Sequence, residues 1–147
     1  MRVGQNEAVI AEDFKAGKCD GMSLSGMRGR QFNSFTGSLD AIGAIPDIKL
    51  AVKFMQGLAS PTFSKMMTNG KYEVVGVIPV GDAYLMVKDR NINTVAKMAG
   101  KKIAVIDSDQ AQKIMVQQIG GQAVNADISN FSTKFNQGQV DIIGAPV

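Results

Sequence analysis

Most residues that could do chemistry in this chain come at the ends of predicted strands, and their types suit binding. They are Ser23, Ser25, Gly26 and Arg28 at the first strand, Gly81, Asp82 and Tyr84 where the third strand begins, Asp107, Ser108, Asp109 and Gln110 after a fourth, and Gly144 and Pro146 at the last one. In open α/β sheets, ligands bind beyond the carboxyl ends of the strands, where helix N-termini point free N–H groups. These hydroxyl, carboxylate, guanidinium and peptide groups are therefore candidate partners for a small solute.

The charges in these groups differ in sign. The first group carries Arg28, whereas a later one carries Asp107 and Asp109. If both groups line one site, opposite charges on its walls favour a zwitterionic or hydroxyl-rich ligand over a simple dianion. Simpler roles stay open, because Arg28 suits a solvated surface, Asp107 and Ser108 suit helix caps, and Tyr84 alternates with apolar neighbours as core residues do.

Missing residue types limit catalytic and metal chemistry. The chain has no histidine, which excludes Ser-His-Asp and Cys-His machinery and histidine metal sites. Cys19 is the single cysteine, so no internal disulfide or CxxC motif forms, and no imidazole is available to activate its thiol. Residues 26–30 are glycine-rich but lack the spacing of a phosphate-binding loop. We expect no enzymatic activity, no cofactor and no resident metal.

Composition bounds the class of protein and its partners. At 147 residues, with 45% apolar and 20% charged residues, the chain suits one globular domain or two small lobes. The net charge of +3 comes from scattered lysines and arginines, so nucleic acid is not an expected partner. No apolar run approaches the ~20 residues that cross a bilayer. The residues after Met1 are polar and do not form a signal peptide, so we expect either a cytoplasmic protein or the processed form of an exported one.

The pattern Phe-x-x-Gly-x-x-Asp occurs twice, at residues 14–20 and 135–141. Each copy follows an amphipathic stretch and runs into an apolar one. Because glycine adopts the left-handed conformation that ends helices, each copy predicts a helix, a glycine stop and a strand. Two such units far apart suggest two α/β lobes with a cleft between them. The alternative is that both copies are ordinary punctuation between helix and strand.

The first half is predicted to contain four helices and one strand before a pair of β runs. Three of the predicted helices cover residues 6–16, 46–57 and 61–68, and residues 26–33 are predicted as a turn that enters a short helix. The strand covers 19–25, and a loop lies at 36–38. Residues 72–78 and 83–87 then form two β runs that Pro79 and Gly81 interrupt. Such an interruption suits a crossing between lobes, and a plain hairpin is the alternative.

The second half alternates short helices and strands. Helices are predicted at 92–98, 109–119 and 128–137, and strands at 103–106, 122–125 and 140–143; Asp107 and Gln110 resemble a capping pair for the middle helix. This alternation predicts an α/β fold whose mostly parallel sheets are flanked by helices. We expect lobe one at 1–81, which includes the crossing strand, and lobe two at 82–147.

Three passages resemble type 2 periplasmic solute-binding proteins, and most closely the extracytoplasmic receptors of tripartite (TRAP) transporters. They are residues 94–105, which contain Gly-Lys-Lys-Ile, residues 132–141, which end in Gly-Gln-Val-Asp, and residues 12–20. The resemblance implies a two-lobed α/β fold that binds a small solute in a cleft between its lobes. Because members of that family are considerably longer, it also implies that this chain is a fragment.

The same resemblance implies a role in transport. A periplasmic receptor of this kind delivers its solute to a membrane transporter component, without catalysis and without inserting into the membrane. Ala104 departs from the family pattern, which has at this place an arginine that pairs with a substrate carboxylate, so the ligand is expected to differ. The competing hypotheses are an enzyme, or a cytoplasmic ligand-sensing domain, on the same scaffold.

Overall fold

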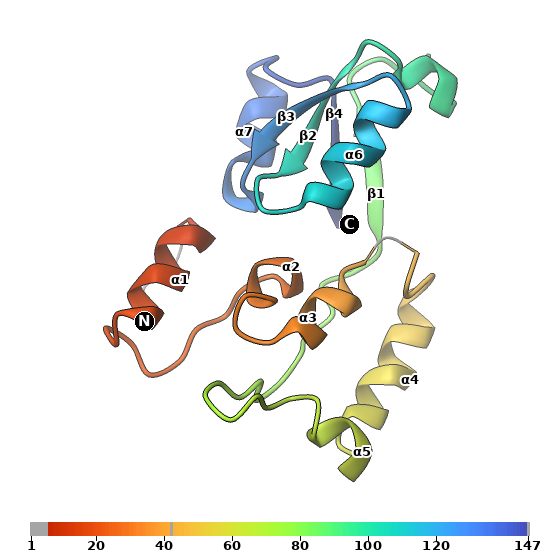
Figure 1. Ribbon diagram of the computed structural model, residues 1–147. Helices are drawn as coiled ribbons and strands as arrows, with labels where there is room; N and C mark the ends of the chain where they lie inside the picture. Colours follow the sequence, from red (N-terminus) through yellow and green to blue (C-terminus); the bar gives the residue numbers. More distant parts are fainter. Residues whose placement is uncertain (1–5, 42, 147) are drawn as a thin grey trace. The chain divides into compact units, whose positions relative to one another are not determined.

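The computed structural model describes residues 6–41 and 43–146, and its contacts divide the chain into two compact units (Figure 1). Unit 1 holds the described residues from Ala83 onward together with those up to Ile10. Unit 2 is Ala11–Asp82. No helix among the residues that the structure describes is long and apolar enough to span a bilayer.

Within the described residues, unit 1 is built on one four-stranded sheet. Its strands are β1 (Ala83–Val87), β2 (Lys102–Ile106), β3 (Gln122–Ala126) and β4 (Ile142–Pro146). Their order is β1-β4-β2-β3, in which β2 runs parallel to β3 and β4 while β1 runs antiparallel to β4. The predicted α/β class with a mostly parallel sheet is therefore confirmed for this unit.

Helices cover both faces of this sheet. The helical segments of unit 1 are η1 (Val95–Met98), α6 (Gln110–Gln118), η2 (Ile128–Asn130) and α7 (Phe131–Asn136). Successive residues of a strand point to opposite faces. Val105 accordingly packs with Val116 of α6, whereas Ala104 packs with Phe131 of α7. The unit is thus a three-layer sandwich with α6 and α7 on opposite sides of the sheet (Figure 1).

Unit 2 is helical. It contains the last part of α1 (Glu7–Lys15), followed by α2 (Gly26–Gly29), α3 (Ser34–Leu39), α4 (Ile48–Leu58) and α5 (Pro61–Ser64). The rings of Phe14, Phe32 and Tyr72 form an aromatic cluster whose centroids lie between 5.0 and 5.7 Å apart. Edge-to-face pairs at such distances add to the stability that burial provides. This cluster joins α1 to segments that follow it by roughly twenty and sixty residues in the chain.

Two amide side chains, of which Asn33 is buried, fix the start of α3. Asn33 is buried, and its Oδ1 accepts the Phe35 N–H at 3.0 Å while its Nδ2 donates to the carbonyl of Met66 at 2.8 Å. The Asn69 amide donates in turn to the carbonyl of Phe32. Because a buried amide needs partners for both its ends, these bonds specify one packing of residues 66–69 against α3.

Two predicted strands in unit 2 are wrong. Residues 19–25 and 72–78 form no ladder with other described residues, and the one bridge near them joins Thr68 to Glu73. An apolar, β-branched run becomes a strand only when a neighbouring strand receives its backbone hydrogen bonds. The hairpin alternative is also wrong, because β1 pairs with β4.

Other predicted boundaries need correction. The loop predicted at residues 36–38 lies inside α3, because Asn33 caps a helix that starts before it. The last strand begins two residues later than predicted, so Gly144 and Pro146 belong to β4 and do not follow it. The cap of α6 is Asp109, whose side chain accepts the Gln112 N–H; the predicted pair of Asp107 and Gln110 is therefore misplaced by two residues.

The repeated heptapeptide predicted a glycine that ends a helix and a strand that follows it, and only the first of these holds for both copies. Gly17 and Gly138 both have positive φ values, 71° and 77°, and each follows the end of a helix. Only the second copy leads into a strand, where the Asp141 carboxylate accepts the Lys102 N–H at 2.8 Å. Asp20 lies in unit 2, outside any strand. The shared element is therefore a helix stop and not a complete helix-to-strand unit.

Candidate functional site

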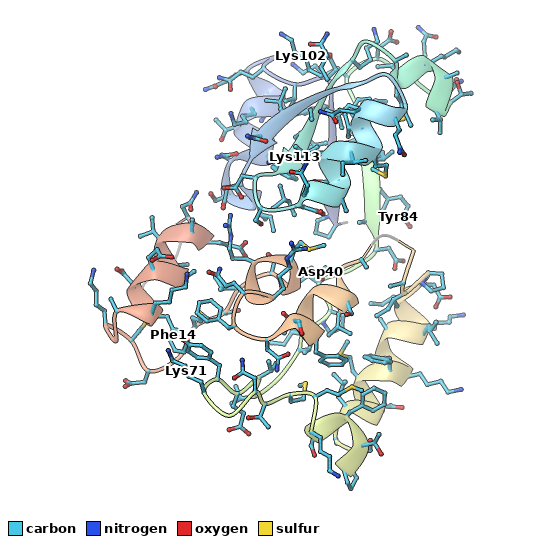
Figure 2. The ribbon with its side chains drawn as sticks, in the orientation of Figure 1. Phe14, Asp40, Lys71, Tyr84, Lys102 and Lys113 are labelled. Atoms are coloured by element: carbon cyan, nitrogen blue, oxygen red, sulfur yellow. The ribbon has the colours of Figure 1, made fainter. Side chains whose placement is uncertain are left out.

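The carboxyl ends of three strands, β2, β3 and β4, lie at the same edge of the unit 1 sheet. β2 and β3 end level with each other, because Ile106 pairs with Ala126. The pairing of Ile103 with Ile142 brings Pro146 level with Asp107, and the antiparallel β1 begins at the same edge because Ala83 pairs with Pro146. Figure 2 shows Tyr84 toward this edge and Lys102 at the opposite end of the sheet.

The register brings one set of predicted site residues together. The residues at the carboxyl edge are Tyr84, Asp107, Ser108, Asp109, Gln110 and Pro146. Gly81 and Asp82 immediately precede β1 in the sequence. Ser23, Ser25, Gly26 and Arg28 belong to unit 2. Their role in binding stays a prediction.

The loop between β2 and α6 is braced by its own hydrogen bonds. Asp109 is buried and accepts the Gln112 N–H at 3.1 Å, and the Gln112 side chain accepts the Ile106 N–H at 2.7 Å. Lys113 donates from Nζ to the carbonyl of Asp107 at 2.8 Å. The Ile106 N–H at the end of β2 and the Gln112 N–H in the first turn of α6 thus have hydrogen-bond partners within this segment. These bonds hold the backbone of Asp107 and Ser108 in place.

The carboxyl edge also contains Asp127, which the sequence prediction missed. This buried residue follows β3, and its Oδ1 accepts both the backbone N–H of Ser129, at 3.0 Å, and its hydroxyl, at 2.7 Å. Its own N–H donates to the Asn130 side chain at 3.0 Å, which completes a capping box. The rule that selected Asp107 would have found Asp127 too, because both follow predicted strands.

Burial separates structural from accessible groups at this edge. Asp109 and Asp127 are buried caps, whereas Asp107 and Gln110 are exposed and Tyr84 is 54% exposed. The Ser108 hydroxyl is buried and has no hydrogen-bond partner among the described residues. A phenol, a carboxylate, an amide and a hydroxyl are therefore the groups that this edge offers for hydrogen bonding.

The first turn of α2 in unit 2 is already occupied by side chains of the chain itself. The Ser25 hydroxyl accepts the Arg28 N–H at 3.3 Å, and Asp40 accepts the Met27 N–H at 2.9 Å (Figure 2). Asp40 was not predicted, because it lies thirteen residues from its partner in a stretch that reads as apolar. These bonds give Ser25 a capping role and place a carboxylate where an anion would otherwise bind.

A surface hollow of about 420 Å³ lies beside these residues within unit 2. Its lining residues are Arg30, Ser34, Gly37, Ser38 and Ala41. None of these residues was predicted from the sequence, since Arg30 carries no signal that separates it from a surface charge. The missing side chain at Gly37 makes room for the Arg30 stem, whose Cβ lies 2.9 Å from the position that a Gly37 Cβ would take.

Ala104 lies deep in the sheet. It is 2% exposed and packs with Ala126, Phe131, Val140 and Ile143. An arginine at this position would place its guanidinium among apolar side chains unless α7 moved, at a large desolvation cost. The packing around Ala104 is therefore built for a small apolar side chain.

The capping role of Asp109 predicts a distinctive pair of mutants. Replacement by alanine is expected to lower the free energy of unfolding by about 1 kcal/mol, because α6 loses its N-cap. Asparagine is as good a cap as aspartate, so Asp109→Asn is expected to keep most of that stability. Urea denaturation followed by far-UV circular dichroism measures both. Equal destabilisation by the two substitutions would show that the negative charge, and not the cap, is what matters.

Comparisons with known proteins agree on one family. A family model described as "Solute-binding protein AdeT 1/2" matches residues 1–147. "Probable solute-binding protein AdeT1" from Acinetobacter baumannii is 53% identical over 142 residues, which are 97% of this chain and 47% of the relative. "Probable solute-binding protein AdeT2" from the same organism is 40% identical over 111 residues, 76% of this chain and 47% of the relative. The chain thus spans about half the length of these curated relatives.

Solved structures share the fold. A TRAP periplasmic solute-binding protein from Sulfitobacter sp. NAS-14.1, with bound β-D-galacturonate, matches with a TM-score of 0.78 at 18% identity and covers 97% of this chain and 47% of that one. A TRAP periplasmic solute-binding protein from Shewanella oneidensis, with bound succinate, matches with a TM-score of 0.78 at 13% identity and covers 95% and 45%. The fold expected from the resemblance is confirmed by these matches. This chain belongs to the AdeT 1/2 family of solute-binding proteins.

Proposed function

We propose that this chain binds a small solute at the carboxyl edge of unit 1, as part of a periplasmic, non-catalytic receptor that hands the solute to a membrane transporter. The family and the names of the relatives support solute binding. The observation that carries the site is the register of the sheet. It brings Tyr84, Asp107, Ser108 and Gln110 to one edge, although they lie up to 26 residues apart in the sequence.

The chemistry of this edge favours a ligand that both donates and accepts hydrogen bonds. The Asp107 carboxylate accepts from hydroxyl or ammonium groups, and the Tyr84 phenol and the Gln110 amide do both. The buried Ser108 hydroxyl lacks a protein partner within the described residues, and a polar ligand atom would satisfy it. Lys113 is half-buried and donates to the Asp107 carbonyl, so the cation nearest to this loop in sequence is engaged.

The apolar surroundings of Ala104 point to a ligand class different from simple dicarboxylates. β2 has no cation at that position to pair with a ligand carboxylate. A carboxylate that is buried without such a partner loses more hydration free energy than its new contacts return. We therefore expect a hydroxyl-rich or zwitterionic solute. The solved relatives with bound galacturonate and succinate provide the contrasting acidic ligands for the test.

The test is isothermal titration calorimetry with a panel of neutral sugars, amino acids, uronates and dicarboxylates. For the ligand that binds, Tyr84→Ala and Asp107→Ala are each expected to weaken the affinity about tenfold or more, as loss of one ligand hydrogen bond does. Asp20→Ala is the matched control, since it removes an exposed carboxylate of unit 2. Unchanged affinity in both edge variants would reject the site, and a dicarboxylate as the tightest ligand would reject the proposed ligand class.

A further inference from the structure

The amino edge of the unit 1 sheet, opposite to the candidate site, gathers basic residues that are scattered in the sequence. The Lys88 N–H donates to the carbonyl of Asp141 at 3.1 Å, and the Asp141 N–H donates to the carbonyl of Lys102 at 2.8 Å. Lys88 and Lys102 thus lie on either side of the start of β4, and Figure 2 shows Lys102 at this end of the sheet. Arg90 follows Lys88 in the turn after β1. The full set, here called the basic edge, is Lys88, Arg90, Lys97, Lys101, Lys102 and Lys134.

Two helical segments, η1 and α7, bring the remaining members to this edge. Lys101 immediately precedes β2 and donates its N–H to the last residue of η1 at 3.1 Å, so η1 with its Lys97 ends here. Lys134 lies in the last turn of α7. The next residue of that helix, Phe135, has its ring centroid 5.5 Å from Nζ of Lys88, which joins α7 to the end of β1. Lys101 and Lys134 are half-buried, and the other members of the basic edge are exposed.

The positive charge of the basic edge is not balanced by carboxylates. The acidic residues that the structure places there are Asp89 and Asp141, and each is engaged by the backbone. Asp89 accepts the Asn91 N–H at 2.9 Å, and Asp141 accepts the Lys102 N–H at 2.8 Å. None of the basic-edge cations forms an ion pair within the part of the chain that the structure describes. A surface with charge of one sign raises the local concentration of partners with the opposite charge.

We propose that the basic edge binds the surface of a bilayer that contains anionic phospholipids. Five of its six members are lysines. Lysine is depleted from protein–protein interfaces, where arginine is favoured because its planar fork pairs with a carboxylate through two hydrogen bonds. A lipid surface makes no such geometric demand, since its charge is spread over many headgroups, and each lysine near it adds to the attraction. The composition of the edge therefore favours an anionic membrane over an acidic protein.

Val95 of η1 fits the same partner. Its side chain is 61% exposed and lies two residues from Lys97. An apolar side chain beside lysines suits the boundary between headgroups and acyl chains. Because the candidate site lies at the opposite edge of the sheet, binding through the basic edge keeps Tyr84 and Asp107 away from the bilayer, on the aqueous side.

The proposal is tested by cosedimentation of this chain with lipid vesicles. Vesicles of phosphatidylglycerol and phosphatidylethanolamine are expected to bind the chain at low ionic strength, whereas vesicles of phosphatidylcholine alone are not. Binding is expected to weaken as sodium chloride is added, because salt screens the charges. The double variant Lys97→Gln with Lys102→Gln is expected to weaken the affinity for the anionic vesicles about tenfold or more, since both side chains are exposed and each contributes several-fold.

The matched control is Lys49→Gln with Lys53→Gln, which removes the same charge from two exposed lysines of α4 in unit 2. These lysines are not part of the basic edge, so the control is expected to keep its affinity for the vesicles within about twofold. Equal weakening by both double variants would show that net charge drives binding, and would overturn the proposal. Absence of binding to anionic vesicles, or equal binding to phosphatidylcholine, would overturn it too.

A soluble acidic polymer distinguishes the other class of partner. Binding to poly-L-glutamate without binding to anionic vesicles would assign the basic edge to an acidic protein and so overturn the lipid assignment. Far-UV circular dichroism checks that both double variants keep the fold, as is expected for substitutions of exposed side chains. None of these measurements includes a solute, so they can fail without bearing on the proposed function.

Discussion

Ile142→Ala is expected to lower the free energy of unfolding of unit 1 by about 3 kcal/mol. Ile142 is fully buried in β4, the strand that joins β1 to β2. It belongs to the cluster that contains Ile103, Val105 and Val116, so its side chain links the sheet to α6. Truncating a buried isoleucine to alanine removes apolar contacts and leaves a cavity, which typically costs about 2–5 kcal/mol.

The measurement is urea denaturation followed by far-UV circular dichroism, with amide hydrogen exchange to assign the effect to unit 1. Ile114→Ala is the control, because it makes the same change on α6 at a side chain that is nearly half exposed. Its expected cost is below about 1 kcal/mol, in proportion to the smaller area that it buries. A control as destabilising as Ile142→Ala would show that the core of unit 1 lies elsewhere.

The fold of unit 1 was predictable because its elements are local. The apolar run from Ile103 to Ile106 lies beside glycine punctuation, and β2, α6 and β3 follow one another with short connections. A strand, a helix and a second parallel strand in succession bury one another without help from distant parts of the chain. The boundaries were less predictable, since the apolar Val140 is buried but precedes β4.

The predicted strands of unit 2 failed for the opposite reason. Residues 19–25 and 72–78 have strand-like composition, but composition does not supply a neighbour. Pairing partners of a strand can lie anywhere in a chain, and none of the described residues pairs with these two segments in a ladder. The local composition therefore carried no information about whether a neighbouring strand exists.

In the candidate site too, positions next to a strand were predictable from the sequence, whereas burial and contacts between distant residues were not. The strand-end rule found Asp107 and Ser108 because a buried strand directly precedes them. No local pattern separates a carboxylate that caps a helix from one that faces solvent, so the burial of Asp109 emerged only from the structure. Asp40 is the extreme case, since the N–H group that it accepts belongs to Met27.

Gly26→Ala is expected to destabilise unit 2 by about 2 kcal/mol. A Cβ at Gly26 would lie 2.5 Å from the carbonyl oxygen of Thr36 and 2.9 Å from Oδ2 of Asp40. A backbone oxygen cannot move without shifting α3, and displacing Asp40 would break its bond to the Met27 N–H. Overpacking of this kind costs about 1–3 kcal/mol. Urea denaturation of the variant and of the unaltered chain measures the difference.

Gly57→Ala is the matched control, and its effect is expected to have the opposite sign. Gly57 lies near the end of α4, where the nearest atom to an added Cβ is Cε2 of Phe63 at 4.0 Å, an ordinary contact distance. Alanine restricts the unfolded chain and favours the helix, so a gain of about 0.5 kcal/mol is expected. The two substitutions add the same methyl group to helical glycines, and therefore a difference in sign isolates the contact with α3 as the cause. If both substitutions stabilised the protein, Gly26 would have room for a side chain and the close approach of α2 to α3 would be wrong.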